Sequence, residues 1–357
     1  MQINSSRSSN LEFFRIITML IIVGHHYVMN SGLLNVMEAN YAATASLFYY
    51  LFGMWGKTGI NCFVMITGYF MCRSQITLRK FIKLYFEVVF YSLIILIIFT
   101  LSGKVDFSAK DLIFAFLPFR NVISDSFVHA FIVWWLFIPF LNILVHNMTQ
   151  REHLWLTILC VIVFSVYDKM PITKIDVNPI CWFSTIYLVA SYIRFYPKCI
   201  YKSENAQIWG LCTLIIILLS MLSVVSIHYI YNLQGKTILP YALVSDSNAP
   251  FALLTAIASF LFFKNLKVKH SSFINAVGAT TFGVLLIHAN SATMRSWLWG
   301  SVVGCIDHFS IPFYWLYAIG ATLTIFAVCS SIDYLRIRIL ERPFMKWVDK
   351  RISNSHK

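Results

Sequence analysis

Charged residues are scarce in this 357-residue sequence. Asp, Glu, Lys and Arg make up 12% of it, whereas a soluble domain carries roughly 25%. So few charges over this length leave too little polar surface to cover a globule in water, which excludes an ordinary soluble protein. Hydrophobic residues make up 59% of the sequence, and long apolar runs recur from end to end. The expected solvent is therefore a lipid bilayer.

Several familiar motifs are also missing. The sequence has no P-loop, no GxSxG, no HExxH and no glycine-rich dinucleotide fingerprint. These absences exclude ATP-driven transport by this chain and ordinary serine or zinc hydrolysis. The eight cysteines include no CxxC pair, and most of them lie in apolar runs. We therefore expect them to be small packing residues, with no metal site and no disulfide framework.

The apolar runs predict an all-α, polytopic bundle of about ten transmembrane helices. We expect one transmembrane domain over residues 1–357, with short tails at 1–9 and 343–357. No internal repeat is visible, which disfavours transporter folds built from two repeated halves. The predicted spans are 10–29, 56–72, 81–101, 127–147, 154–167, 179–195, 208–231, 247–263, 273–290 and 311–332.

Lys and Arg are distributed unevenly between the two sides of these spans. With both termini in the cytoplasm, 20 of the 28 Lys and Arg residues fall on the inner side and 8 on the outer side. Cytoplasmic loops carry such an excess of positive charge, so the pattern predicts an N-in, C-in topology. It also accounts for the formal net charge of +13 without any nucleic-acid partner.

The first span carries Glu12, Arg15, His25 and His26, although ionisable groups inside a bilayer are costly and are functional candidates. Arg15 and His26 are 11 residues apart, which places them on one helical face, roughly 16 Å apart along the axis. Glu12 can pair with Arg15 at i,i+3. One interpretation is an entrance for a charged donor that leads to a general base, His26. The alternative is an ion pair at the membrane edge with an interfacial histidine, and spacing alone leaves both open.

The loop after the second span is basic. Arg73, Arg79 and Lys83 could hold the phosphates of a cytoplasmic nucleotide-like cofactor. The same residues could equally be an inner-face topology signal or a contact for anionic lipid. Glu87 lies one turn beyond Lys83, so we predict that these two side chains pair as the helix enters the membrane.

Two further residues could bind substrate. His288, near the end of the ninth span, is predicted to lie close to the outer face, where it either contacts substrate or caps the helix. Trp135 could form a platform for a sugar ring, or it could belong to the aromatic belt of the membrane interface.

The first span, Leu11-Glu12-Phe13-Phe14-Arg15 through Gly24-His25-His26, resembles the opening of the acyltransferase-3 family of membrane acyltransferases. That family has an arginine, ten intervening residues and a histidine, with an acid three residues before the arginine. Arg15, His26 and Glu12 match these positions, although the family acid is often Asp. The segments 57–70, 134–142 and 281–288 resemble later family segments, so the resemblance extends over nearly the whole chain.

The resemblance is closest to members that O-acetylate bacterial cell-surface polysaccharides. It implies a multi-pass enzyme of the bacterial cytoplasmic membrane that moves an acetyl group from acetyl-CoA to a sugar hydroxyl of a glycan or a lipid-linked precursor. His26 would be the general base or a transient nucleophile, and Arg15, held by Glu12, would stabilise negative charge. Arg79 and Lys83, with Arg73, would bind donor phosphates, and His288 and Trp135 would contact the acceptor.

Two other hypotheses remain. The polytopic architecture would also suit an exporter of polysaccharide intermediates, which would not need an imidazole at this spacing. A membrane O-acyltransferase with a His/Asn pair would have to use His288 and Asn290. It ranks last, because such enzymes usually carry the histidine in a central span.

Overall fold

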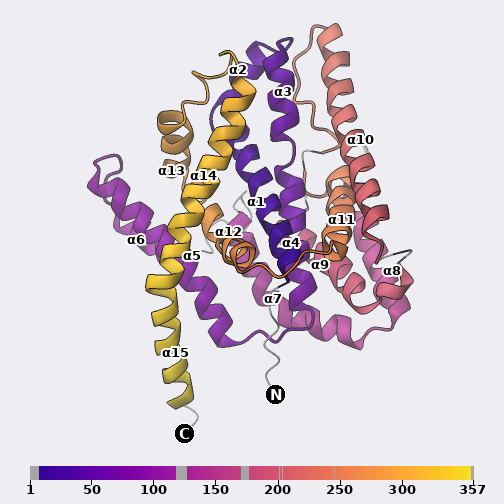
Figure 1. Cartoon of the computed structure of the whole chain (residues 1–357), viewed down its shortest axis with the longest axis vertical. Coiled ribbons are helices and arrows are strands. Elements are labelled where there is room, and N and C mark those ends of the chain that lie inside the picture. The colour runs from indigo at the N-terminus through magenta and orange to yellow at the C-terminus, as the bar shows by residue number, and fades with distance from the viewer. Residues whose placement is uncertain are drawn as a thin grey trace.

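The computed structural model describes residues 8–117, 127–169, 177–200, 202, 204–244 and 246–354, and in these ranges every regular element is helical. Of the two predicted tails, residues 1–7 and 355–357 lie outside the described residues. The helices, labelled in Figure 1, are α1 Ser9–Met29, α2 Leu33–Ala39, α3 Thr44–Gly53, α4 Gly56–Met71, α5 Leu78–Leu101, α6 Ala109–Phe116, α7 Phe127–Asn147, α8 Gln150–Val161, α9 Pro179–Phe195, α10 Ala206–Leu233, α11 Pro250–Asn265, α12 Ser272–Ala289, α13 Ala292–Ser296, α14 Tyr314–Arg336 and α15 Arg342–Asn354.

Short π and 3-10 segments extend or join these helices. They are the π segments Ile162–Val166, Trp297–Val302 and Ile337–Glu341, and the 3-10 segments Tyr167–Lys169 and Pro197–Cys199. The π segment Ile337–Glu341 joins α14 to α15 in one continuous helical rod (Figure 1). Such a wide turn changes which side chains share a helical face.

Six helices of the described residues are long and apolar enough to cross a membrane: α1, α5, α7, α10, α12 and the rod Tyr314–Ser353. This confirms an all-helical, multi-pass membrane protein. Each of the ten predicted spans overlaps a helix, but α4, α8, α9 and α11 have only 16, 12, 17 and 16 residues. α4 and α9 are largely buried inside the bundle.

α1 lies at the centre of the bundle and contacts α3, α4, α12 and α14 (Figure 1). α10 lies at the periphery, and of its 28 residues only Ser220, Val224 and His228 are buried. A helix with so much exposed apolar surface suits contact with lipid. The chemistry is therefore expected around α1.

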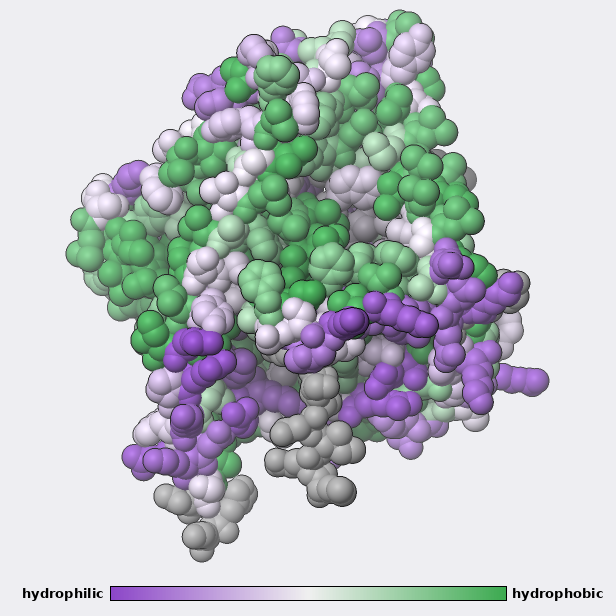
Figure 2. Space-filling model, in the orientation of Figure 1, coloured by the Kyte–Doolittle hydropathy of each residue, from purple (hydrophilic) through white to green (hydrophobic). Residues whose placement is uncertain are grey.

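Hydrophilic residues gather at the end of the molecule where α1 begins and α15 ends (Figure 2). The connection between α4 and α5, which carries the basic loop, lies at this same end. α5 begins at a cap in which the Thr77 side chain accepts from the Lys80 backbone N–H. This cap fixes the start of the helix that carries Arg79 and Lys83.

The segment predicted as a C-terminal tail is a packed helix. α15 covers 342–354, contacts α5 and buries Met345 and Val348. α15 therefore supplies one wall of the site described next.

Candidate functional site

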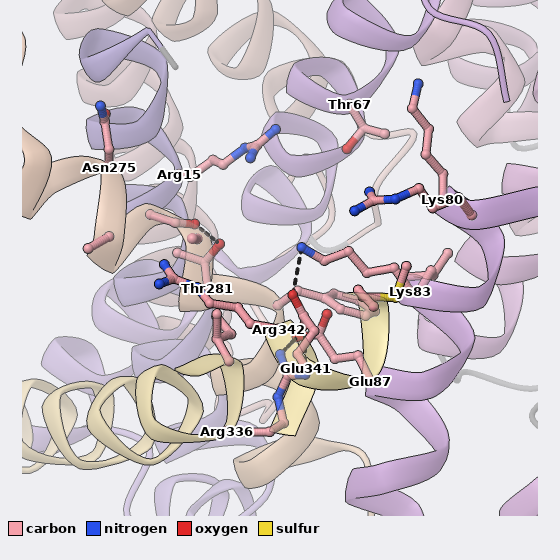
Figure 3. A pocket seen from close by; sticks show the side chains of 18 of the residues that line it. Arg15, Thr67, Lys80, Lys83, Glu87, Asn275, Thr281, Arg336, Glu341 and Arg342 are labelled. Carbon is pink, nitrogen blue, oxygen red and sulfur yellow. Dashed lines mark hydrogen bonds and ion pairs between the residues drawn. The ribbon is translucent and has the colours of Figure 1, made fainter. Parts of the chain in front are cut away.

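A cavity of about 890 Å³ opens at the hydrophilic end of the bundle (Figure 3). Its walls come from α1, α4, α5, α7 and α12 and from the rod that contains α14 and α15. Sites for small molecules and cofactors usually measure roughly 300–1,000 Å³, so this cavity is large for a ligand site.

Positive charge dominates the wall of this cavity, which we call the basic cavity. Three acidic side chains line it: Glu87, Glu341 and Asp349. Seven Lys and Arg side chains line it: Arg15, Arg79, Lys80, Lys83, Arg336, Arg342 and Lys346. The excess of cations favours an anionic ligand.

Arg15 points into the basic cavity from α1 (Figure 3). Its Nη1 donates to Glu12 Oε1 at 3.3 Å, which confirms the predicted i,i+3 pair. Glu12 is buried against Gly278 of α12, where any Cβ would collide with the Glu12 carboxylate. Close packing of α1 on α12 therefore holds the acid that orients Arg15.

Arg79 and Lys83 also line the basic cavity, and each is paired with a carboxylate from the C-terminal rod. Arg79 Nε donates to Asp349 Oδ1 at 2.6 Å, and Lys83 Nζ lies 2.8 Å from Glu341 Oε1 (Figure 3). The prediction that Glu87 pairs with Lys83 is wrong. Arg336 pairs with Glu87 at 3.0 Å, because the C-terminal rod packs on α5 through the π segment Ile337–Glu341 and α15.

Arg336 is the centre of a buried ion cluster formed by Glu87, Asp333, Arg336 and Glu341. Its Nε donates to Asp333 Oδ1 at 2.6 Å and its Nη1 to Glu341 Oε2 at 2.8 Å, and the Tyr91 hydroxyl also donates to Asp333, at 2.7 Å. The π segment after Arg336 lets Glu341 reach back to it. Since unpaired charge is very costly away from water, this cluster fixes α14 against α5.

His26 and His288 form a second centre, the histidine pair. Their Nδ1 and Nε2 atoms lie 2.9 Å apart, although the residues are 262 positions apart in the chain. His288 is completely buried, whereas His26 retains some exposed surface. The neighbouring ring of His25 bonds elsewhere, to the Gly53 carbonyl at 2.5 Å.

The histidine pair does not line the basic cavity. Phe63, Phe131 and Phe282 line the cavity wall, and their ring centroids lie 5.8 to 6.2 Å apart. Phe282 is six residues before His288 on α12, roughly 9 Å along the axis. Along α12, the cavity wall therefore ends at Phe282, short of the histidine pair.

Comparison with known proteins decides the family. The family model for the acyltransferase domain, Acyl_transf_3, matches residues 8–334. The chain belongs to the acyltransferase-3 family. A search of curated proteins and a search of solved structures give no match. The predicted family is therefore confirmed, and this acyltransferase-3 chain is a membrane acyltransferase.

The other predicted site residues of this acyltransferase lie in different places. Trp135 lines the basic cavity, with 6% of its surface exposed. Arg73 is not in the cavity wall, and its guanidinium lies 5.5 Å from the centre of the Phe195 ring on α9. His288 has no exposed surface and lies 2.9 Å from His26. All eight cysteines fall among the described residues, and all are free.

Sequence analysis missed Arg342 and Lys346, two cations of the cavity wall. They are four residues apart on α15 and therefore lie on one face of that helix. Within the described part of the chain, no acidic side chain forms an ion pair with either of them. It also missed the cluster around Arg336, for which the i,i+3 pair Asp333–Arg336 in an apolar span was the available signal.

Proposed function

We propose that this acyltransferase moves an acetyl group from acetyl-CoA to a sugar hydroxyl of a bacterial surface polysaccharide or of its lipid-linked precursor. The observation that carries the proposal is the arrangement on α1. This helix holds Arg15 in the wall of a basic cavity and His26 in a histidine pair deeper in the bundle. One helix thus connects an anion-binding site to an imidazole.

The basic cavity suits the donor, which supplies an activated acyl thioester when bound. Arg79 and Lys83 already hold carboxylate oxygens at 2.6 and 2.8 Å, so phosphate oxygens can take the same positions. About half of the Arg79 side chain is exposed, and an exposed ion pair contributes little. Arg342 and Lys346 would complete the phosphate site.

His26 would act on the acceptor. A neutral imidazole can take the proton of a sugar hydroxyl as general base, or it can carry the acyl group as a nucleophile. Both roles use a ring nitrogen with a free lone pair. Arg15, oriented by Glu12, would orient the donor in the basic cavity, roughly 16 Å along α1 from His26. Trp135 would contact the ligand from α7.

For the membrane arrangement, we propose one domain of about ten spans, with both ends in the cytoplasm of a bacterium and the bundle in its cytoplasmic membrane. The start of α1 and the end of α15 at one end of the bundle support an even number of spans (Figure 1). The gathering of hydrophilic residues at that end supports its cytoplasmic position (Figure 2).

The test is the O-acetyl content of the surface polysaccharide, measured by proton NMR in cells that carry the wild type, a deletion, His26→Gln or His25→Asn. We expect the deletion and His26→Gln to lose the O-acetyl signal while polysaccharide and protein amounts stay the same. Positioned proton transfer contributes about 10²- to 10⁴-fold in rate.

His25→Asn is the matched control. It keeps a donor near the Gly53 carbonyl, and it should retain acetylation. Full acetylation with His26→Gln would contradict the proposal. Loss of the polysaccharide itself in the deletion, with intermediates held inside the cell, would favour the exporter.

A further inference from the structure

We propose that His288 is a positioning residue: it holds the His26 ring in the tautomer whose Nε2 carries the free lone pair. This inference rests on the proposed function, since it concerns the atom through which His26 would act. It differs from the expectation that His288 contacts substrate.

The carbonyl oxygen of Val284 determines which nitrogen of His288 carries a hydrogen. His288 Nδ1 lies 2.6 Å from Val284 O, one turn earlier on α12. A carbonyl can only accept, so His288 Nδ1 must carry the hydrogen. In a neutral imidazole the other nitrogen is then an acceptor, which leaves His288 Nε2 without a hydrogen.

The next bond follows from the first. His288 Nε2 lies 2.9 Å from His26 Nδ1 and can only accept, so His26 Nδ1 must donate. His26 Nε2 is then the unprotonated nitrogen. No acidic side chain of the described residues bonds to either ring, and the site lies within the bundle, so two neutral rings are favoured. For two neutral rings, the hydrogens in the chain from His26 through His288 to the Val284 carbonyl can therefore be placed in only one way.

Burial separates the roles of the two rings. His288 exposes none of its surface, and Trp299 packs edge-on against it with the ring centres 6.2 Å apart. A substrate cannot contact such a ring. His26 keeps exposed surface, so His288 can act only through His26. This arrangement matches the general pattern in which a third group orients a catalytic base.

Among the residues that the structure describes, His26 has no comparable alternative partner. The His25 ring centre is 5.5 Å from that of His26, and its Nδ1 donates to Gly53 O. Arg295 lies near the pair but donates to the carbonyl of Ala289, at 2.6 Å. Without His288, the His26 ring is thus expected to sample both tautomers.

The test uses the full-length protein in lipid, labelled with ¹⁵N-histidine, and compares the wild type with His288→Gln and His288→Leu. The amide oxygen of Gln can still accept from His26 Nδ1, whereas Leu cannot. The His26 signals are identified by their absence in His26→Gln. In the wild type we expect His26 Nδ1 to be protonated and Nε2 to be bare, and in His288→Leu we expect a mixture.

Activity provides the second measurement. We expect kcat to fall about tenfold or more in His288→Leu and to recover to within a few-fold in His288→Gln, with KM for the donor unchanged in both. An active wild type with a protonated His26 Nε2 would overturn the inference, even if a variant failed to fold. Equal losses with Gln and Leu would also overturn it. A wild type that transfers no acyl group would instead contradict the proposed function.

Discussion

Different interactions hold the side chains of the basic cavity and those of the histidine pair. The cavity wall is held by ion pairs such as Lys83–Glu341 and Arg79–Asp349, whose cations are 44% and 50% exposed. In the histidine pair, hydrogen bonds between neutral groups order the rings, and His288 has no exposed surface. Exposed charges can change partner at little cost, whereas buried polar groups must stay satisfied. Under the proposed function, binding and chemistry would therefore occupy separate regions of this bundle.

The two regions also differ in their relation to the family. The histidine pair lies inside the matched range 8–334. Seven residues of the cavity wall lie beyond it: Arg336, Ile337, Glu341, Arg342, Met345, Lys346 and Asp349. The π segment and α15 therefore complete the basic cavity with residues outside the matched range.

The largest effect is expected in the buried ion cluster. Its groups are charged, like those of the cavity wall, and buried, like His288. Arg336→Leu leaves Glu87 and Asp333 buried without their common cation, which should destabilise the protein by about 3–5 kcal/mol. Thermal unfolding of the purified protein in detergent measures this. Arg338→Leu is the control, because Arg338 is exposed and its loss should cost about 0.5 kcal/mol or less. Equal stability of the two variants would mean that the cluster does not fix α14 against α5.

The second prediction separates binding from chemistry. Replacing both Arg342 and Lys346 by Gln should raise KM for acetyl-CoA about five- to tenfold and leave kcat unchanged, because under the proposed function these cations would contact only the donor phosphates. Higher ionic strength should raise the wild-type KM in the same way. Lys350→Gln on the same helix is the control, since Lys350 does not line the cavity. A fall in kcat at constant KM would mean that these cations act in the chemical step, and it would contradict the separation of binding from chemistry.

The smallest effect is expected from the exposed pair Arg79–Asp349. Asp349→Asn removes the internal carboxylate that competes with a phosphate for Arg79. An exposed pair contributes about 0–1 kcal/mol, so KM for the donor should fall by less than about fivefold. Steady-state kinetics measure the change, with Asp307→Asn as the control outside the cavity. A rise in KM would indicate that Asp349 positions Arg79 and does not compete for it.

The sequence by itself determined the helices and, within α1, the contact between Glu12 and Arg15. Apolar runs predicted the bounds of α1, α7 and α9 to within a residue, because the bilayer demands long apolar segments. Helical periodicity predicted the Glu12–Arg15 pair and put Arg15 and His26 on one helix. The family resemblance rested on those same local positions.

Only the tertiary structure decided which distant side chains meet. His26 meets His288 because α12 packs on α1, and Lys83 meets Glu341 because the C-terminal rod packs on α5. Local periodicity cannot specify such contacts, since it fixes the face of a helix but not its neighbour. For the same reason, the sequence did not show that Arg342 and Lys346 line a cavity. The wall that they form exists only after α15 packs on α5.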